Sequence, residues 1–124
     1  MAQTIPIYID TDTTTSASIA DGSETAEAAI TTNSGGVGKC LLWGVHGKLS
    51  STGGEVTVRV YDDDSSTSLM YEVLFDFADS AVNKSDLMNS PIPLFATPYF
   101  VVEGDGTSAG KTINLTFYVQ ALRG

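Results

Sequence analysis

Strict alternation of apolar and polar residues is the feature of the sequence that most restricts its fold. In residues 55–61, Val56, Val58 and Val60 alternate with Glu, Thr, Arg and Tyr, and residues 112–120 repeat the pattern with Ile, Leu, Phe and Val. A period of two places every second side chain on the same face of a β-strand, whereas a helix needs a period near 3.6. Both segments are therefore predicted to be strands with one face in the core and one face outside.

Less regular apolar segments predict further strands, separated by breaks rich in Gly, Ser and Asp that are typical of turns. Residues 69–77 are expected to follow the first strand through a hairpin loop at residues 62–68, and residues 104–110 to form a glycine-rich hairpin. Only residues 79–88 are expected to form a short helix. The remaining predicted strands cover residues 4–10, 16–20, 26–32, 39–49 and 98–103.

Seven to eight strands with so little helix predict an all-β fold. The sequence has 124 residues, the size of one hydrophobic core, so residues 1–124 are expected to form a single β-sandwich domain. Within it, residues 1–10 are either an extended arm or an edge strand. Because the chain lacks the helices that connect parallel strands, the two sheets are expected to be antiparallel. A jelly-roll sandwich is favoured, and an immunoglobulin-like or other Greek-key sandwich is the alternative.

The charge of the chain excludes two classes of partner. Fifteen acidic residues against six basic ones give a formal net charge of −9 at pH 7. The basic residues are scattered singly and form no stripe that would bind the phosphates of a nucleic acid or an anionic membrane. Neither nucleic acid nor a membrane is therefore an expected partner, and the acidity is expected to keep the protein dispersed through like-charge repulsion.

The sequence contains no recognisable catalytic, cofactor or metal motif. Residues 104–112 resemble a phosphate-binding loop, but Asp105 occupies the position of its first glycine. Residues 62–64 lack the spacing of an EF-hand, so a solvated turn is the preferred interpretation. The single histidine, His46, lacks the serine elbow of a hydrolase and lies too far from Cys40 on one strand for a local dyad. We therefore predict a protein that is not an enzyme and has no catalytic residues, cofactor or metal.

Two apolar segments point to contacts beyond a simple sandwich. Residues 40–45 and 92–102 are mostly apolar at successive positions, so both faces of these strands carry apolar side chains. In an antiparallel sandwich one face of a strand packs in the core and the other normally meets water. Here the outer face is also apolar, so it needs cover from the chain itself or from another subunit. Self-association is the expected answer, and a homotrimer closes such a surface by symmetry. The expected interface residues are Ile5, Pro6, Ile7, Tyr8, Tyr61, Leu74 and Tyr118.

Residues 53–62, and residues 91–95 with the strand that follows, resemble strands of virion jelly-roll proteins. In size, acidity and Ser/Thr/Gly-rich style, and in lacking an evident signal peptide, the whole chain resembles the small β-sandwich decoration (cement) proteins of tailed-phage capsids. The resemblance implies a structural protein of the virion, made in the host cytoplasm and located on the capsid surface. It also implies that residues 1–10 form an arm, and that the protein clamps neighbouring subunits of the major capsid protein.

A carbohydrate- or receptor-binding β-sandwich, such as a lectin-like module or a phage tail or fibre component, is the alternative. Such a module stacks a sugar ring on an exposed aromatic side chain. Trp43 lies in the most apolar segment and is expected in the core, which leaves Tyr61 and Tyr118 as candidates. An aromatic residue buried between subunits favours the structural role, whereas an aromatic residue exposed beside polar groups favours sugar binding.

Overall fold

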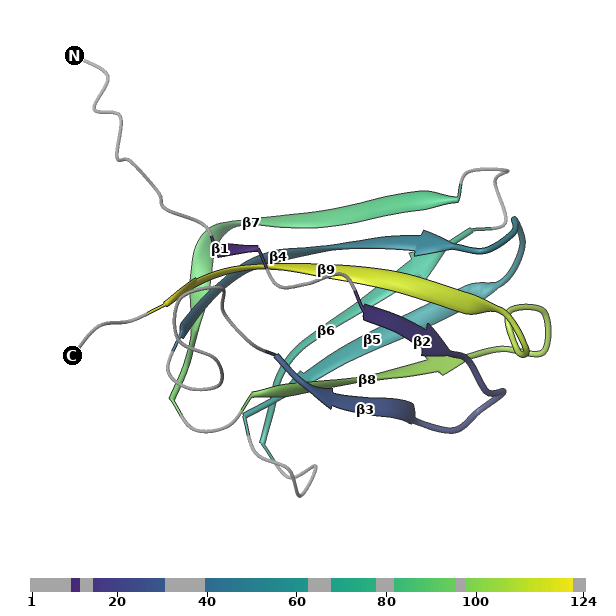
Figure 1. Cartoon of the computed structure of the whole chain (residues 1–124), viewed down its shortest axis with the longest axis horizontal. Helices are drawn as coiled ribbons and strands as arrows, with labels where there is room; N and C mark the ends of the chain where they lie inside the picture. Colours follow the sequence, from purple (N-terminus) through teal and green to yellow (C-terminus); the bar gives the residue numbers. More distant parts are fainter. Residues whose placement is uncertain are drawn as a thin grey trace, which may run out of the picture.

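The computed structural model describes residues 10–11, 15–30, 40–62, 68–77, 82–95 and 98–121. These residues form two antiparallel sheets packed face to face, with no helix among them (Figure 1). Sheet 1 consists of β1 (Asp10–Thr11), β2 (Thr15–Ser18), β4 (Cys40–Leu49), β7 (Asn83–Leu94) and β9 (Thr112–Ala121). Sheet 2 consists of β3 (Thr25–Ala29), β5 (Glu55–Tyr61), β6 (Leu69–Asp76) and β8 (Tyr99–Gly104). The predicted all-β, two-sheet antiparallel sandwich is confirmed.

The strand order is that of a jelly roll. Sheet 1 has the order β1-β9-β4-β7, with β2 also pairing with β9, and sheet 2 has the order β3-β8-β5-β6. The antiparallel pairs β2–β9, β3–β8, β4–β7 and β5–β6 are nested, as in a long hairpin rolled up into two sheets. Because β1 and β2 follow one another along β9, the two sheets are each four strands wide in the described part of the chain.

The core consists of the inward faces predicted by the alternation. Val56, Val58 and Val60 of β5 are fully buried, and so are the four inward residues of β9. Across the sandwich, the rings of Phe100 and Phe117 lie with their centroids 5.1 Å apart. Burying an aliphatic or aromatic side chain of this size contributes about 1.5–3 kcal/mol. The two sheets are therefore held together mainly by these alternate positions.

The other predicted strands agree with the structure within a few residues, except at the N-terminus. β2, β3, β4 and β8 lie where strands were expected, and the backbone N–H of Asp62 donates to the carbonyl of Ser68 (2.9 Å), closing the predicted β5–β6 hairpin. Of the expected strand over residues 4–10, Asp10 pairs with Val119 and the rest lies outside the described residues. The arm or edge strand at residues 1–10 therefore stays a prediction.

The helix expected over residues 79–88 is wrong, because residues 83–94 form strand β7. This strand lies at the edge of sheet 1, where it pairs with β4 through register partners such as Val45 with Asp86 and His46 with Ser85. An edge strand does not require a regular apolar pattern, and the pairing of β7 with β4 outweighs a weak local preference for helix. Pro91 and Pro93, which lack a backbone N–H, fit an edge position.

Residues 104–110 do not form the expected hairpin, because they connect β8 of sheet 2 to β9 of sheet 1. The Asp105 carboxylate accepts hydrogen bonds from the backbone N–H groups of Ser108 (2.8 Å), Thr107 (2.9 Å) and Glu55 (3.1 Å). The buried Ser108 hydroxyl donates to the Glu55 carbonyl (2.7 Å) and accepts from the Asp105 N–H (2.9 Å). The connection is thereby fastened to the start of β5, and the hydrogen bonds, that from Ser108 first, lower the pKa of Asp105.

We expect Asp105→Asn to lower the free energy of unfolding by about 1–2 kcal/mol at pH 7, because an amide accepts these hydrogen bonds more weakly than a carboxylate. The folded-state pKa of Asp105 is lowered, so its stabilising contribution is present above about pH 4 and is lost as the pH falls through the folded-state value. Urea unfolding at pH 7 and pH 3 should therefore show the difference between the two proteins shrinking in acid. A difference independent of pH would contradict this role.

Candidate functional site

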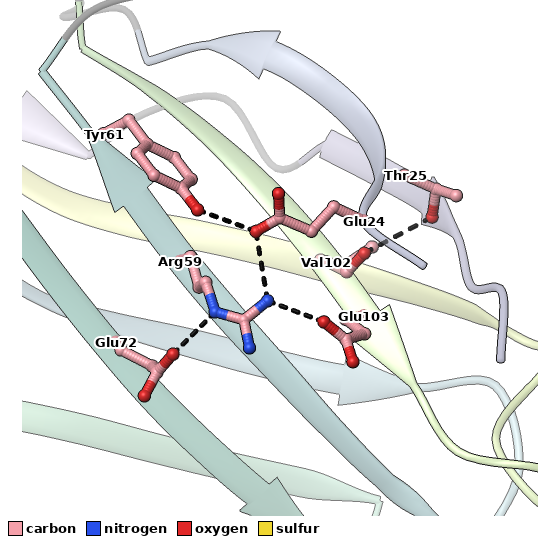
Figure 2. A network of polar contacts seen from close by, with 7 residues as sticks. All are labelled: Glu24, Thr25, Arg59, Tyr61, Glu72, Val102 and Glu103. Carbon is pink, nitrogen blue, oxygen red and sulfur yellow. Dashed lines mark hydrogen bonds and ion pairs between the residues drawn. The ribbon is translucent and has the colours of Figure 1, made fainter. Parts of the chain in front are cut away.

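The outer face of sheet 2 carries a network of ion pairs around one arginine (Figure 2). Arg59 of β5 donates through Nε to Glu72 of β6 (2.6 Å) and through Nη1 to Glu103 of β8 (2.7 Å) and to Glu24, just before β3 (3.0 Å). The hydroxyl of Tyr61 donates to the same oxygen of Glu24 (2.8 Å). The network thus joins β5, β6 and β8 to the residue that precedes β3, on the side of sheet 2 away from the core.

The protonation states in this network follow from its contacts. Hydrogen bonds to Glu103 and then Glu72 raise the pKa of Arg59 above its already high usual value. Burial, and then the hydrogen bond to Glu24, raise the pKa of Tyr61 to about 12. At neutral pH Arg59 is therefore charged and Tyr61 is a hydrogen-bond donor. With three carboxylates against one guanidinium, the network keeps an excess of negative charge.

Two predicted interface residues, Tyr61 and Leu74, lie on this acidic face. Tyr61 points away from the core as predicted, but its ring stacks on Tyr99, with centroids 5.4 Å apart, and only 8% of it is exposed. Leu74 is 56% exposed and lies between Glu72 and Asp76 on the same side of β6. Tyr61 therefore offers little surface to a partner, and Leu74 is an apolar side chain with an acidic residue on either side along β6.

Trp43 lies on the outer face of sheet 1, so its predicted place in the core is wrong. The register of β4 against both β7 and β9 shifts between Leu42 and Gly44, which makes a β-bulge at Trp43. Leu42 remains in the core, whereas the half-buried Trp43 donates through Nε1 to the side chain of Gln120 on β9 (3.2 Å). The indole is thus held in a fixed orientation on the outside of the sandwich.

Tyr118, the third predicted interface residue among the described ones, lies on this same face. It is half-buried on β9 and pairs with Gly44 of β4, which in turn pairs with Leu87 of β7. A Cβ at Gly44 would lie 2.5 Å from the carbonyl oxygen of Asp86, so only glycine fits between its neighbours. Leu87 is 69% exposed, the largest fraction among the large hydrophobic residues described.

Polar side chains continue the outer face of sheet 1 beyond Tyr118. His46 of β4 is hydrogen-bonded through Nδ1 to the hydroxyl of Ser85 (2.6 Å) and through Nε2 to the side-chain oxygen of Asn83 (3.1 Å). A serine beside an imidazole is the start of a nucleophilic triad, but the orienting group here is a neutral amide rather than a buried carboxylate. These partners of His46 were not predicted, because residues 83–85 were expected to lie in a helix rather than in strand β7.

The outer face of sheet 1 differs from that of sheet 2 in its charge. Asp86 is the only acidic residue in β4, β7 and β9. It points inward, where its carboxylate accepts a hydrogen bond from Tyr71 of β6, and burial followed by this hydrogen bond raises the pKa of Tyr71. We call the outer side of these three strands the acid-free face; its main residues are Leu41, Trp43, His46, Lys48, Ser85, Leu87, Tyr118 and Gln120.

The remaining predicted interface residues, Ile5, Pro6, Ile7 and Tyr8, lie outside the described residues. Within the described ranges, no group of three or more His, Cys, Asp or Glu side chains is placed to hold a metal ion. The same part of the chain contains no helix long and apolar enough to span a membrane. The chain matches no protein-family model, no curated protein and no solved structure.

Proposed function

We propose that this chain is a non-enzymatic structural protein of a virus particle, a decoration protein that binds the outside of the assembled shell. In this role it self-associates, as a homotrimer, and clamps neighbouring subunits of the major capsid protein. The unequal charge of the two outer faces supports the proposal most strongly. A protein that coats a shell needs one surface for protein contacts and another that faces solvent and repels other particles. The acidic face of sheet 2 suits the second task.

The mechanism is thermodynamic linkage rather than catalysis. A protein that binds only the assembled shell stabilises that shell by mass action. Many copies that each contact two or more shell subunits add avidity without tight individual contacts. The jelly-roll body supplies a rigid unit for this task, and residues 1–9 are the segment proposed to reach across to the shell.

Deletion of residues 1–9 is expected to abolish binding to the shell while leaving the fold intact. The fold survives because the deletion keeps Asp10 and Thr11, which pair with Val119 and Tyr118 in β1. Co-sedimentation with empty shells of the same virus's major capsid protein measures binding, and circular dichroism checks the fold. Full binding by the shortened chain would remove the arm from the mechanism, and failure of the full-length chain to bind would contradict the proposed function.

The second candidate is a carbohydrate- or receptor-binding function, which the outward position of Trp43 favours. The indole is oriented by Gln120 on a face that also carries Tyr118 and the polar pair His46 and Ser85. An oriented aromatic ring beside hydroxyl and amide groups is suited to a sugar ring. Because Trp43 is the only tryptophan in the chain, quenching or a shift of its fluorescence on titration with glycans tests this candidate directly.

A further inference from the structure

We infer that the acid-free face of sheet 1 binds a second copy of this chain. The inference rests on the self-association in the proposed function and names the surface responsible for it. Because this face meets its own copy, the contact is two-fold and gives a pair, in place of the threefold contact of a homotrimer. It moves the predicted interface away from Tyr61 and Leu74, which lie on the acidic face, and keeps only Tyr118 from the described residues of that prediction. It adds Trp43 and Leu87, which lie on the same face as Tyr118; Gly44 of β4 separates Leu87 on β7 from Tyr118 on β9.

The distribution of charge selects this face for self-association. Two copies of a chain with a net charge of −9 repel one another unless their acidic surfaces stay apart. When the acid-free faces meet, the networks around Arg59 lie on the two far sides of the pair. With sheets stacked about 10 Å apart, the networks are separated by roughly 30 Å. That distance exceeds the screening length of about 8 Å at physiological salt, so the repulsion is largely removed.

The composition of the acid-free face is that of a protein interface. Its apolar part contains a tryptophan, a tyrosine and the exposed Leu87, and it lacks acidic side chains. Aromatic residues are enriched and acidic residues depleted at the centres of interfaces, where tryptophan and tyrosine often dominate the binding energy. The polar pair His46 and Ser85 and the exposed Lys48 lie toward one end, where a hydrated rim is expected.

The area of the face is sufficient for a weak, reversible contact. Its three strands, of ten to twelve residues each, present roughly 500 Å² per copy at spacings of about 4.8 Å between strands and 3.3 Å along them. Two copies then bury roughly 1,000 Å², which lies below the range for stable protein pairs and above that of most crystal contacts. Disruption of the apolar part of this face is therefore expected to separate the copies.

The test makes the same substitution, leucine to glutamate, on the acid-free face and on the acidic face. Leu87→Glu places a carboxylate on the acid-free face and should raise the dissociation constant at least about 30-fold, the effect of burying an unpaired charge in the apolar part of the contact. Leu74→Glu makes the same change at a residue of similar exposure on the acidic face and should leave association unchanged. Light scattering over a concentration series measures the mass of both variants and of the unmodified chain, and circular dichroism confirms that each is folded.

The fluorescence of Trp43, the single tryptophan, gives a second readout at the proposed contact. On dilution of the unmodified chain, its emission should shift to longer wavelength and its quenching by acrylamide should increase as the copies separate. Leu87→Glu should show the dissociated spectrum at all concentrations. Association that survives in Leu87→Glu, or is lost only in Leu74→Glu, would overturn the choice of face. A chain that stays monomeric at high concentration would overturn self-association itself, whether or not it binds a shell or a glycan.

Discussion

Gly54→Ala is expected to lower the free energy of unfolding by about 3–5 kcal/mol, by combining backbone strain with a steric clash. Gly54 has φ = +99°, a backbone conformation that residues other than glycine rarely adopt. A Cβ there would lie 2.5 Å from the backbone nitrogen of Ser108 and 2.9 Å from its Cα. Ser108 cannot move aside easily, since its buried hydroxyl is hydrogen-bonded to Glu55 and to Asp105. The substitution therefore separates the β8–β9 connection from the start of β5.

Gly110→Ala is the matched control for this prediction. Gly110 also has a positive φ, +85°, but a Cβ there would meet no atom within 4 Å. Only backbone strain remains, so the expected loss is about 1–2 kcal/mol. Chemical denaturation of both variants at pH 7 measures the difference. If the two substitutions destabilise the protein equally, the contact with Ser108 is not what fixes glycine at position 54.

The sequence predicted those strands in which one face meets the core and the other meets water. β5 and β9 are central strands of this kind, so burial imposes a period of two on Val56, Val58 and Val60 and on their counterparts in β9. β7 escaped prediction because it is an edge strand. Its polar beginning, with Asn83 and Ser85, is placed by pairing with β4, and pairing with a distant segment leaves no local pattern.

Residues 40–45 show why a continuous apolar run misleads. The run was expected to place Trp43 in the core, but Leu42 occupies the core and Trp43, the next residue, points outward; the β-bulge then changes the phase of the strand so that Val45 points inward. A bulge depends on how three strands fit together, and the sequence of one of them does not specify it. Gly44 is the local sign, because it occupies the place where β7 leaves no room for a side chain.

The network around Arg59 was only partly predictable. Alternation placed Arg59 on the outer side of its strand, and the predicted hairpin to residues 69–77 brings it opposite its register partner Glu72. Glu24 and Glu103 come from distant segments and reach Arg59 only because the jelly-roll order brings β3 and β8 beside β5. Predicting the difference in charge between the two outer faces likewise requires the topology. Neighbouring residues along each strand belong to opposite faces, and only the strand order shows which strands share a face.

Removal of the central cation by Arg59→Gln is expected to lower the free energy of unfolding by about 2 kcal/mol at pH 7. Glu24 and Glu103 both approach the same nitrogen of Arg59, within 3.0 Å, so without the guanidinium their charges repel at close range. The side chain of Arg59 is 22% exposed, and solvent screening keeps the loss below that of a fully buried pair. Urea unfolding at pH 7 measures the loss.

The matched control is Glu72→Gln, which removes the most exposed carboxylate of the network and should change stability by less than about 1 kcal/mol. In 1 M salt, where the screening length is about 3 Å, the loss caused by Arg59→Gln should be smaller, because salt screens both the ion pairs in the unmodified protein and the repulsion in the variant. A loss that stays the same in 1 M salt, or one matched by Glu72→Gln, would mean that Arg59 stabilises sheet 2 through its packing rather than its charge. In that case Arg59 would contribute to the stability of sheet 2 only by filling space, and the repulsion among the acidic residues of this face would cost little stability without a central cation.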